Sequence, residues 1–252
     1  MSSKKVMNEN QSLRNQRKKI INDNSDFFTV EEFNTLRTNI MFSSTDSKCK
    51  VIGITSPKVS EGKTLICLNL AISLGKAGEN VLVIDGDLRA PKQSKLVDVD
   101  GSKGLSNLLV NKVKLSEIII STDYENVDIM PSGSKPPNPS EMLGSETMKD
   151  LIEYLKEYYN YILIDLPPIN LVTDAAVASK YSSGIVLVAK AGQTRKEDLA
   201  ESIQRMNNKN CKVLGIVLNG KAPSSVGYGK KGKYSRYGAK SYSQYVEKYK
   251  AE

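Results

Sequence analysis

The segment Thr55–Thr64 is a loop of small and polar residues whose composition suits phosphate binding. It follows a short apolar run, Val51–Ile54, and leads into a segment with a helical pattern. In such a loop the backbone N–H groups surround phosphate oxygens at the start of a helix. Lys63 can then reach the β- and γ-phosphates of a nucleotide, and the Thr64 hydroxyl can bind Mg²⁺. We therefore predict an ATP site formed by consecutive residues: Ser60, Glu61, Gly62, Lys63, Thr64 and Leu65.

The loop departs from the full pattern G-x-x-x-x-G-K-[ST]. Pro57 stands where the first glycine belongs, and Ser60 stands where many such loops have glycine. An ordinary helix start is the alternative reading of Gly62–Thr64. The strand-like run before the loop and the helical pattern after it favour the nucleotide site.

Two carboxylates follow a second apolar run, Val81–Ile84. Asp85 and Asp87 are separated by Gly86, which lets the backbone turn, so both can face the same crevice. Asp85 can bind Mg²⁺, and either carboxylate can orient or deprotonate an attacking hydroxyl. A turn built on Asp-Gly chemistry is the alternative.

A third carboxylate, Asp165, ends the run Tyr161–Ile164 and is followed by Leu-Pro-Pro, which stops the strand. Four apolar residues and then an acid place a carboxylate on the magnesium side of a nucleotide, where Asp165 holds the metal through water. A strand-capping acid is the alternative, but the three signals occur together at strand ends. The predicted catalytic set is Lys63, Asp85, Asp87 and Asp165, and the predicted metal ligands are Thr64, Asp85 and, through water, Asp165.

The elements that must position these residues form an alternating pattern. Six apolar runs, nearly continuous and rich in β-branched residues, are typical of strands covered on both faces: Val51–Ile54, Val81–Ile84, Val127–Met130, Tyr161–Ile164, Ile185–Ala189 and Val213–Leu218. Helical patterns occur at 30–42, 63–77, 140–158, 173–182 and 195–208. Strand–helix alternation predicts an α/β fold with a parallel sheet, in which ligands bind at the carboxyl ends of the strands.

The charge is concentrated at the two ends of the chain. The formal net charge is +8, of which residues 1–24 carry +4 and residues 221–252 carry +6, leaving −2 for residues 25–220. This argues against a fold that binds DNA in a basic groove. We expect a basic polar N-terminal arm at 1–27, most simply solvated, a nucleotide-binding domain at 28–220, and a flexible tail at 221–252.

The composition excludes several classes of protein. The chain has no histidine, which removes histidine catalysis and histidine metal ligands. Its three cysteines are scattered, so neither a zinc ribbon nor a disulfide framework is expected, and this fits a reducing cytoplasm. No apolar run is long enough to span a bilayer, and the polar start does not resemble a secretory signal.

With these residues in place, residues 28–252 resemble the bacterial tyrosine kinases (BY-kinases), in the stand-alone cytoplasmic form of capsular or exopolysaccharide systems. The resemblance rests on five stretches: Glu61–Thr64, Val83–Arg89, Ile162–Pro168, Gly133–Leu143 with its Pro-Pro-Asn-Pro-Ser-Glu string, and the tyrosine-rich end. The nucleotide motifs alone are shared with the partitioning and division-site ATPases. The resemblance implies a phosphate-loop NTPase-like fold, a parallel sheet flanked by helices with a disordered tail.

The resemblance also implies self-association into a ring through an early helix with the pattern Glu-x-x-Arg-x-x-Arg. Glu31 and Arg37 occupy the outer positions, and Asn34 replaces the middle arginine. Lys58 falls where the partitioning ATPases carry a signature lysine, six residues before Thr64. We interpret Lys58 as coincidental, because its neighbours lack the glycines of that group.

The C-terminal segment supports kinase chemistry. Six of the twelve tyrosines lie in the last 25 residues, separated by Gly, Ser and Lys without a pattern that would bury them. We predict that they are phosphoacceptors: Tyr228, Tyr234, Tyr237, Tyr242, Tyr245 and Tyr249. A nucleic-acid-binding arm and a plain solvated tail are the alternatives. Each phosphate would add about −1.5 to −2 charges, so two or three would partly cancel the +6.

The predicted function is ATP-dependent autophosphorylation, in trans, of this tyrosine cluster, which regulates polysaccharide synthesis and export. The resemblance implies a transmembrane activator of the polysaccharide co-polymerase type, a homo-oligomer, a cognate tyrosine phosphatase and a cytoplasmic location at the inner face of the membrane. No nucleic-acid partner is expected. The alternatives are an ATPase switch of the partitioning type without kinase activity, and a nucleotide-binding scaffold that never turns over.

Overall fold

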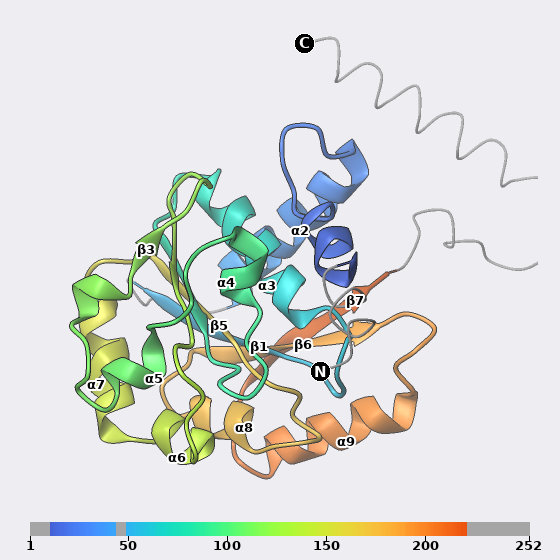
Figure 1. The fold of residues 1–252 in the computed structure, drawn as a ribbon. Helices are drawn as coiled ribbons and strands as arrows, with labels where there is room; N and C mark the ends of the chain where they lie inside the picture. The colour runs from blue at the N-terminus through green and yellow to red at the C-terminus, as the bar shows by residue number, and fades with distance from the viewer. Residues whose placement is uncertain (1–10, 44–48, 221–252) are drawn as a thin grey trace, which may run out of the picture. The chain divides into compact units, whose positions relative to one another are not determined.

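The computed structural model describes residues 11–43 and 49–220. Within this part of the chain a seven-stranded sheet has the order β3-β4-β2-β5-β1-β6-β7 (Figure 1). All neighbouring strands are parallel except β3, which runs antiparallel to β4 at one edge. The strands are β1 (Lys50–Thr55), β2 (Val81–Asp85), β3 (Ile120–Ser121), β4 (Val127–Met130), β5 (Tyr161–Asp165), β6 (Gly184–Lys190) and β7 (Val213–Asn219).

Helices cover both faces of the sheet, as apolar strands require. Figure 1 shows α2, α3 and α4 on one face and α6 to α9 on the other. Two separate clusters of buried apolar side chains fill these layers. The helices are α2 (Phe27–Ser43), α3 (Lys63–Gly75), α4 (Gln93–Val97), α5 (Leu105–Leu108), α6 (Pro139–Leu143), α7 (Glu146–Leu155), α8 (Asp174–Ala178) and α9 (Lys196–Asn207), with a 3₁₀ turn at Leu115–Glu117. The predicted α/β class is confirmed.

The register of the central strands brings two predicted acids side by side. β2 and β5 are neighbours, and Asp85 is paired directly with Asp165 at the carboxyl end of both strands. β1 lies on the other side of β5 and leads into the phosphate loop. The predicted nucleotide residues therefore meet at the carboxyl ends of the central strands.

The helix expected at 140–158 is two helices. α6 ends at Leu143 and α7 begins at Glu146, with Gly144 and Ser145 between them. The Ser145 hydroxyl accepts a hydrogen bond from the backbone N–H of Met148, which is the usual contact of an N-cap serine. Ser145 therefore starts a second helix, although the helical pattern of apolar residues in the sequence continues through this position.

The basic N-terminal segment is packed against the domain from residue 11 onward, rather than simply solvated. Residues 11–17 are helical, and Ile20 and Ile21 are buried in the apolar cluster that also contains side chains of α2 and α3. The Asn69 side chain on α3 accepts a hydrogen bond from the N–H of Ile21 and donates one to the carbonyl of Lys19. Arg17 donates to the carbonyl of Lys95 in α4.

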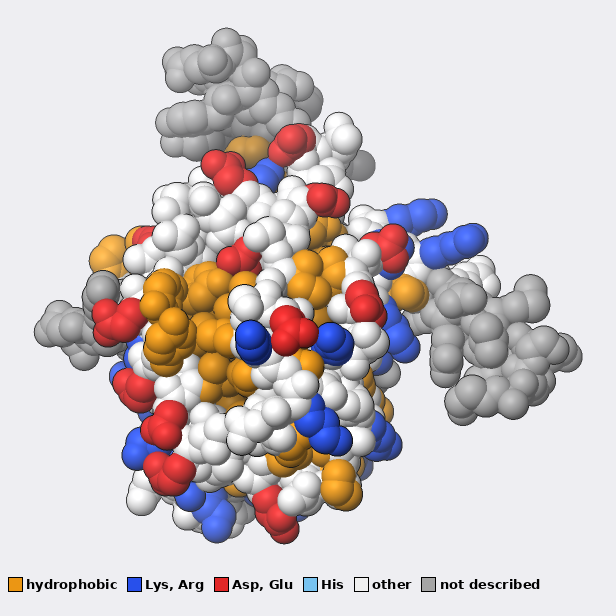
Figure 2. All heavy atoms as spheres, turned by 60° about the vertical axis from the view of Figure 1, so that its left-hand side comes forward, with side chains coloured by type: hydrophobic (Ala, Val, Ile, Leu, Met, Phe, Trp, Pro, Cys, Tyr) orange, Lys and Arg blue, Asp and Glu red, His pale blue; other side chains and the backbone are white. Residues whose placement is uncertain are grey.

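One face of the molecule carries hydrophobic side chains crossed by charged ones (Figure 2). Over the described residues as a whole, the exposed apolar or aromatic side chains include those of Val110, Tyr154 and Tyr158. Among the described residues, no helix is both long and apolar enough to cross a membrane.

Candidate active site

The phosphate loop has the backbone that its sequence predicts, with one residue under strain. Gly62 has φ +97°, and a Cβ atom there would clash with Nδ2 of Asn219, so only glycine fits. Ser60 has φ 64°, a left-handed conformation that glycine adopts more readily than serine. Position 60, where many such loops have glycine, therefore has a backbone conformation that favours glycine.

Lys63 lies at the centre of the acidic cluster. Its Nζ atom is 2.9 Å from Oδ2 of Asp87 and 3.2 Å from Oδ1 of Asp165. The Thr64 hydroxyl also interacts with Asp165. All four residues are buried, together with Asp85. The structure therefore brings together all four residues of the predicted catalytic set and the predicted threonine ligand.

The three carboxylates outnumber the one cation, and the titration of the site reflects this. Burial, reinforced by the charge of Asp165, raises the pKa of Asp85 to about 7. Burial also raises the pKa of Asp165, against the opposing effect of Lys63. Burial alone would lower the pKa of Lys63, but the charges of Asp165 and Asp87 outweigh it and raise that pKa. The site therefore has an excess of negative charge that a second cation would relieve.

Two buried oxygen atoms in the cluster have no hydrogen-bond partner among the described residues. Oδ2 of Asp85 accepts the backbone N–H groups of Lys92 and Gln93, at 3.0 and 2.9 Å, whereas its Oδ1 is unpartnered. The side-chain oxygen of Gln93 is also unpartnered. Unpaired oxygen atoms beside a threonine hydroxyl and a second carboxylate form a donor set that suits Mg²⁺. The residues present therefore fit the predicted metal.

The buried carboxylate of Glu61 holds the phosphate loop in place through hydrogen bonds within the protein. Its side chain accepts the backbone N–H of Lys58, at 2.7 Å, and the hydroxyl of Thr194. Asn219, the last residue of β7, donates its side-chain N–H to the carbonyl of Glu61 at 2.9 Å. The loop is therefore held by two segments distant in sequence, while its N–H groups can still face phosphate.

Lys58 is engaged within its own chain. Its Nζ lies 2.6 Å from Oδ2 of Asp198, a buried carboxylate on α9 that also receives two hydrogen bonds from Arg195. Hydrogen bonds from Arg195 and Lys58 hold the pKa of Asp198 well below its usual range. Lys58 therefore has a partner in its own chain, and its interpretation as a coincidental match to the partitioning ATPases stays a prediction.

The Pro-Pro-Asn-Pro-Ser-Glu string is joined to the acidic loop by a hydrogen bond from Arg89 to Ser140, beside an ion pair between Arg89 and Asp174. Arg89 donates to both carboxylate oxygens of Asp174, at 3.2 and 3.1 Å, and to the hydroxyl of Ser140 at 3.0 Å. Asp174 is fully buried at the start of α8. A bidentate pair of this kind fixes both position and orientation, so α6, α8 and the loop after β2 are held as one unit.

The predicted oligomerisation residues lie on α2. Glu31 is exposed and accepts a hydrogen bond from Asn34, which replaces the family arginine. Arg37 donates to the carbonyl of Ser73 at 2.7 Å and joins α2 to α3. Their role between subunits stays a prediction. The six predicted phosphoacceptor tyrosines lie outside the described residues.

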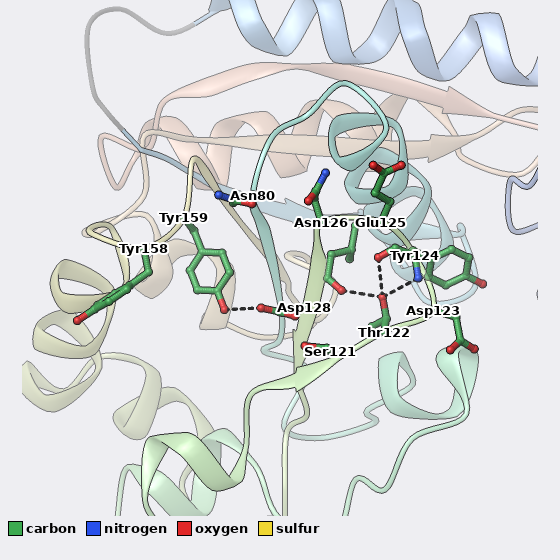
Figure 3. Close-up of a pocket in the computed structure, with 11 residues that line it drawn as sticks. Asn80, Ser121, Thr122, Asp123, Tyr124, Glu125, Asn126, Asp128, Tyr158 and Tyr159 are labelled. Carbon is green, nitrogen blue, oxygen red and sulfur yellow. Dashed lines mark hydrogen bonds between the residues drawn. The ribbon is translucent and has the colours of Figure 1, made fainter.

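A separate pocket of about 600 Å³ lies near the amino ends of the strands, away from the acidic cluster (Figure 3). Asn80 precedes β2 and Tyr159 precedes β5, so the pocket borders the amino ends of these strands. The Tyr159 hydroxyl points toward Asp128 and donates to it at 2.8 Å. The pocket is therefore distinct from the acidic cluster at the carboxyl ends.

Four residues around the cluster were not singled out from the sequence: Gln93, Asp174, Thr194 and Asn219. Asp174 binds Arg89 of the loop after β2, and Asn219 binds Glu61, which lies 158 positions earlier in the sequence. Gln93 follows Asp85 by eight positions and begins α4, a helix too short to show a periodic pattern. No local pattern marks the other three.

Comparisons with known proteins identify the family of this chain. The AAA domain family matches residues 49–214. The chain is 39% identical over 189 residues to the putative tyrosine-protein kinase CapB of Staphylococcus aureus, covering 75% of this chain and 83% of the relative. It is 34% identical over 235 residues to the tyrosine-protein kinase YwqD of Bacillus subtilis, covering 93% and 97%.

Solved structures show the same fold. The chimerical protein CapA2B2 matches with a TM-score of 0.75 at 36% identity, over 80% of this chain and 89% of that one. The kinase domain of the Escherichia coli tyrosine kinase ETK matches with 0.75 at 30% identity, over 81% and 80%. The septum site-determining protein MinD of Pyrococcus horikoshii, complexed with Mg-ADP, matches with 0.59 at 29% identity, over 69% and 72%. With a buried lysine–carboxylate cluster at a phosphate loop and relatives that span most of its length, the chain belongs to the bacterial tyrosine-protein kinases.

Proposed function

We propose that this kinase transfers the γ-phosphoryl group of ATP to tyrosines in the C-terminal segment of a neighbouring copy, and that this controls capsular or extracellular polysaccharide synthesis. The observation that carries the proposal is the buried cluster in which Lys63 contacts Asp87 and Asp165 beside the phosphate loop. The six tyrosines of the C-terminal segment supply hydroxyl acceptors in the same chain.

In this reaction the phenol oxygen forms a bond to the γ-phosphorus while the bond from that phosphorus to the bridging oxygen breaks. The phenol proton passes to a carboxylate, and ADP leaves with the bridging oxygen. Either Asp85 or Asp87 can take this proton: Oδ1 of Asp85 is unpartnered, and the two oxygens of Asp87 accept hydrogen bonds from Ala90 and Lys63. Lys63 and the loop N–H groups hold the phosphates, since phosphoryl transfer depends mainly on positioning and charge neutralisation.

Thr64 and Asp85 would hold Mg²⁺ directly, and Asp165 would hold it through water. An ion held by these residues would neutralise charge on the nucleotide phosphates. No three acidic or cysteine side chains among the described residues gather into a metal site of their own. The remaining ligands would then come from nucleotide and water, as is usual for Mg²⁺.

The partners follow from the same proposal. A transmembrane activator of the polysaccharide co-polymerase type would bring this chain to the inner face of the membrane from the cytoplasm. A ring-like homo-oligomer formed through Glu31 and Arg37 of α2 would present one subunit's tyrosines to the next. A cognate tyrosine phosphatase would reset them. The relative named CapA2B2 is a chimerical protein, which supports the idea of a partner that joins a kinase of this family.

The test is an incubation with Mg²⁺-ATP and the cytoplasmic segment of the activator, followed by detection with an antibody to phosphotyrosine. Wild type is expected to give a signal, whereas Lys63→Met and the variant with all six tail tyrosines changed to Phe are expected to give none. Lys58→Met is the matched control, because it removes a lysine of the same loop that contacts Asp198 instead of the cluster. Phosphotyrosine in Lys63→Met would contradict the site. Free phosphate without phosphotyrosine in the wild type would favour an ATPase switch.

A further inference from the structure

Gln93 is a fully buried amide that contacts every part of the candidate metal site. It begins α4, in the turn that follows Asp85 and Asp87. Its Nε2 atom donates to the carbonyl of Thr64 at 3.1 Å and to Oδ2 of Asp165 at 3.3 Å. Its backbone N–H donates to Oδ2 of Asp85 at 2.9 Å. One residue therefore joins the phosphate loop to the acids that end β2 and β5.

The orientation of the amide is fixed by these contacts. Both groups near Nε2, the Thr64 carbonyl and the Asp165 carboxylate, are acceptors, so a flipped amide would place oxygen against oxygen. The Oε1 atom is therefore the free end of the side chain. It is buried and has no partner among the described residues.

A buried acceptor without a donor is unfavourable by about 1–3 kcal/mol, and such atoms are rare unless a ligand satisfies them. Oδ1 of Asp85 is buried and unpartnered in the same cluster. A hydrated Mg²⁺ satisfies both kinds of atom, because the ion binds a carboxylate oxygen and its water ligands donate hydrogen bonds.

We propose that Gln93 is a positioning residue for the metal-bound nucleotide. Its NH₂ group orients Asp165 and the backbone of Thr64, and its Oε1 atom accepts a hydrogen bond from the hydration shell of the metal. The inference rests on the proposed function for its metal ligands, Thr64, Asp85 and Asp165. It adds a residue outside the phosphate loop and outside the three acids, and it explains why the short helix α4 is placed against the site.

The experiment measures ADP binding to the full chain by calorimetry, in EDTA and in Mg²⁺, so that phosphoryl transfer plays no part. For wild type, Mg²⁺ is expected to increase ADP affinity. In Gln93→Met, which keeps the length of the side chain but has no amide, this increase is expected to fall about tenfold, the effect of one hydrogen bond to a charged site. Affinity in EDTA is expected to stay within about twofold.

Leu96→Ala is the matched control, because Leu96 is buried in the same helix and its side chain packs in the apolar cluster. It tests whether loosening α4 alone changes metal-dependent binding, and it is expected to keep the increase caused by Mg²⁺. If Gln93→Met does not fold, Gln93→Asn is used, since its shorter amide cannot reach both acceptors.

The outcomes separate this inference from the proposed function. An unchanged Mg²⁺ effect in Gln93→Met, an equal loss of affinity with and without Mg²⁺, or an equal loss of the Mg²⁺ effect in Leu96→Ala would each overturn the role of Gln93. If Mg²⁺ has no effect on ADP binding even in wild type, the metal site itself is wrong. Phosphotyrosine formation is tested separately.

Discussion

Replacing Asp85 by asparagine should make the nucleotide-free protein more stable while it removes metal-dependent nucleotide binding. Asp85 is fully buried beside Asp165, and burial together with that charge raises its pKa from an ordinary value of 3.8 to about 7. The asparagine side chain would be uncharged, and its oxygen could still accept the N–H groups of Lys92 and Gln93. The variant therefore removes the unfavourable charge and keeps the main hydrogen bonds.

The direction and size of the change in the free energy of unfolding follow from the linkage between proton binding and folding. Between about pH 4 and pH 7 folded wild type holds a proton on Asp85 that the unfolded chain releases. The free energy of unfolding of wild type therefore falls as pH rises through this interval. At 1.36 kcal/mol per pH unit the full loss is about 4 kcal/mol, of which about 2–3 kcal/mol develops between pH 5 and pH 8.

The assay is urea unfolding in EDTA, followed by circular dichroism, for wild type and Asp85→Asn at pH 5 and pH 8. The stabilisation by Asp85→Asn is expected to be larger at pH 8 by about 2–3 kcal/mol. Asp150→Asn is the control, because Asp150 is exposed on α7 and its replacement should show no such change. A stability advantage that is absent, or that shrinks toward pH 8, would refute the reasoning about buried charge.

Three further changes test other parts of the structure, and a fourth tests the support of the loop. Lys63→Met should lower the free energy of unfolding by about 3–5 kcal/mol at pH 7, because it leaves buried carboxylates without their cation. Lys58→Met should cost less than about 1 kcal/mol in the same urea titration, and equal losses would contradict the difference in burial. Ile21→Ala should cost about 2–5 kcal/mol by thermal or urea unfolding, since Ile21 is 3% exposed; a neutral effect would show that the N-terminal segment is not packed. Thr194→Val removes the hydroxyl that binds Glu61, so ADP affinity measured by calorimetry should fall about tenfold, and unchanged affinity would count against support of the loop by Thr194.

Much of the site could be predicted from the sequence because its signals are local. Lys63 follows Gly62 in a known loop pattern, and Asp85 and Asp165 each end an apolar strand. Parallel pairing then brings such strand ends to one edge, and the register places Asp85 opposite Asp165. The helix expected from residue 63 begins at Lys63.

The remainder could not be predicted because it depends on contacts between distant segments. α4 has only five residues, too few for a periodic pattern, so Gln93 gave no signal of its own. Thr194 and Asn219 reach Glu61 only after β6 and β7 have been placed beside β1. The packing of Ile20 and Ile21 was hidden by the many charges around them, although two adjacent isoleucines are an apolar anchor within a basic segment.

The central claim is transfer of phosphate from the site of one copy to the C-terminal tyrosines of another. It is tested most directly by mixing two proteins, each expected to form no phosphotyrosine alone, with Mg²⁺-ATP and the activator segment. One carries six Tyr→Phe changes in the tail and has an intact site. The other is Lys63→Met, with intact tyrosines and with its folding verified by circular dichroism.

Mass spectrometry of the mixture identifies which chain carries phosphotyrosine. The account predicts phosphotyrosine on the Lys63→Met chain in the mixture and on neither protein alone. If the Lys63→Met chain stays unmodified in the mixture while wild type alone is phosphorylated, transfer between copies is contradicted. If wild type also stays unmodified, the assignment of the C-terminal tyrosines as acceptors is contradicted.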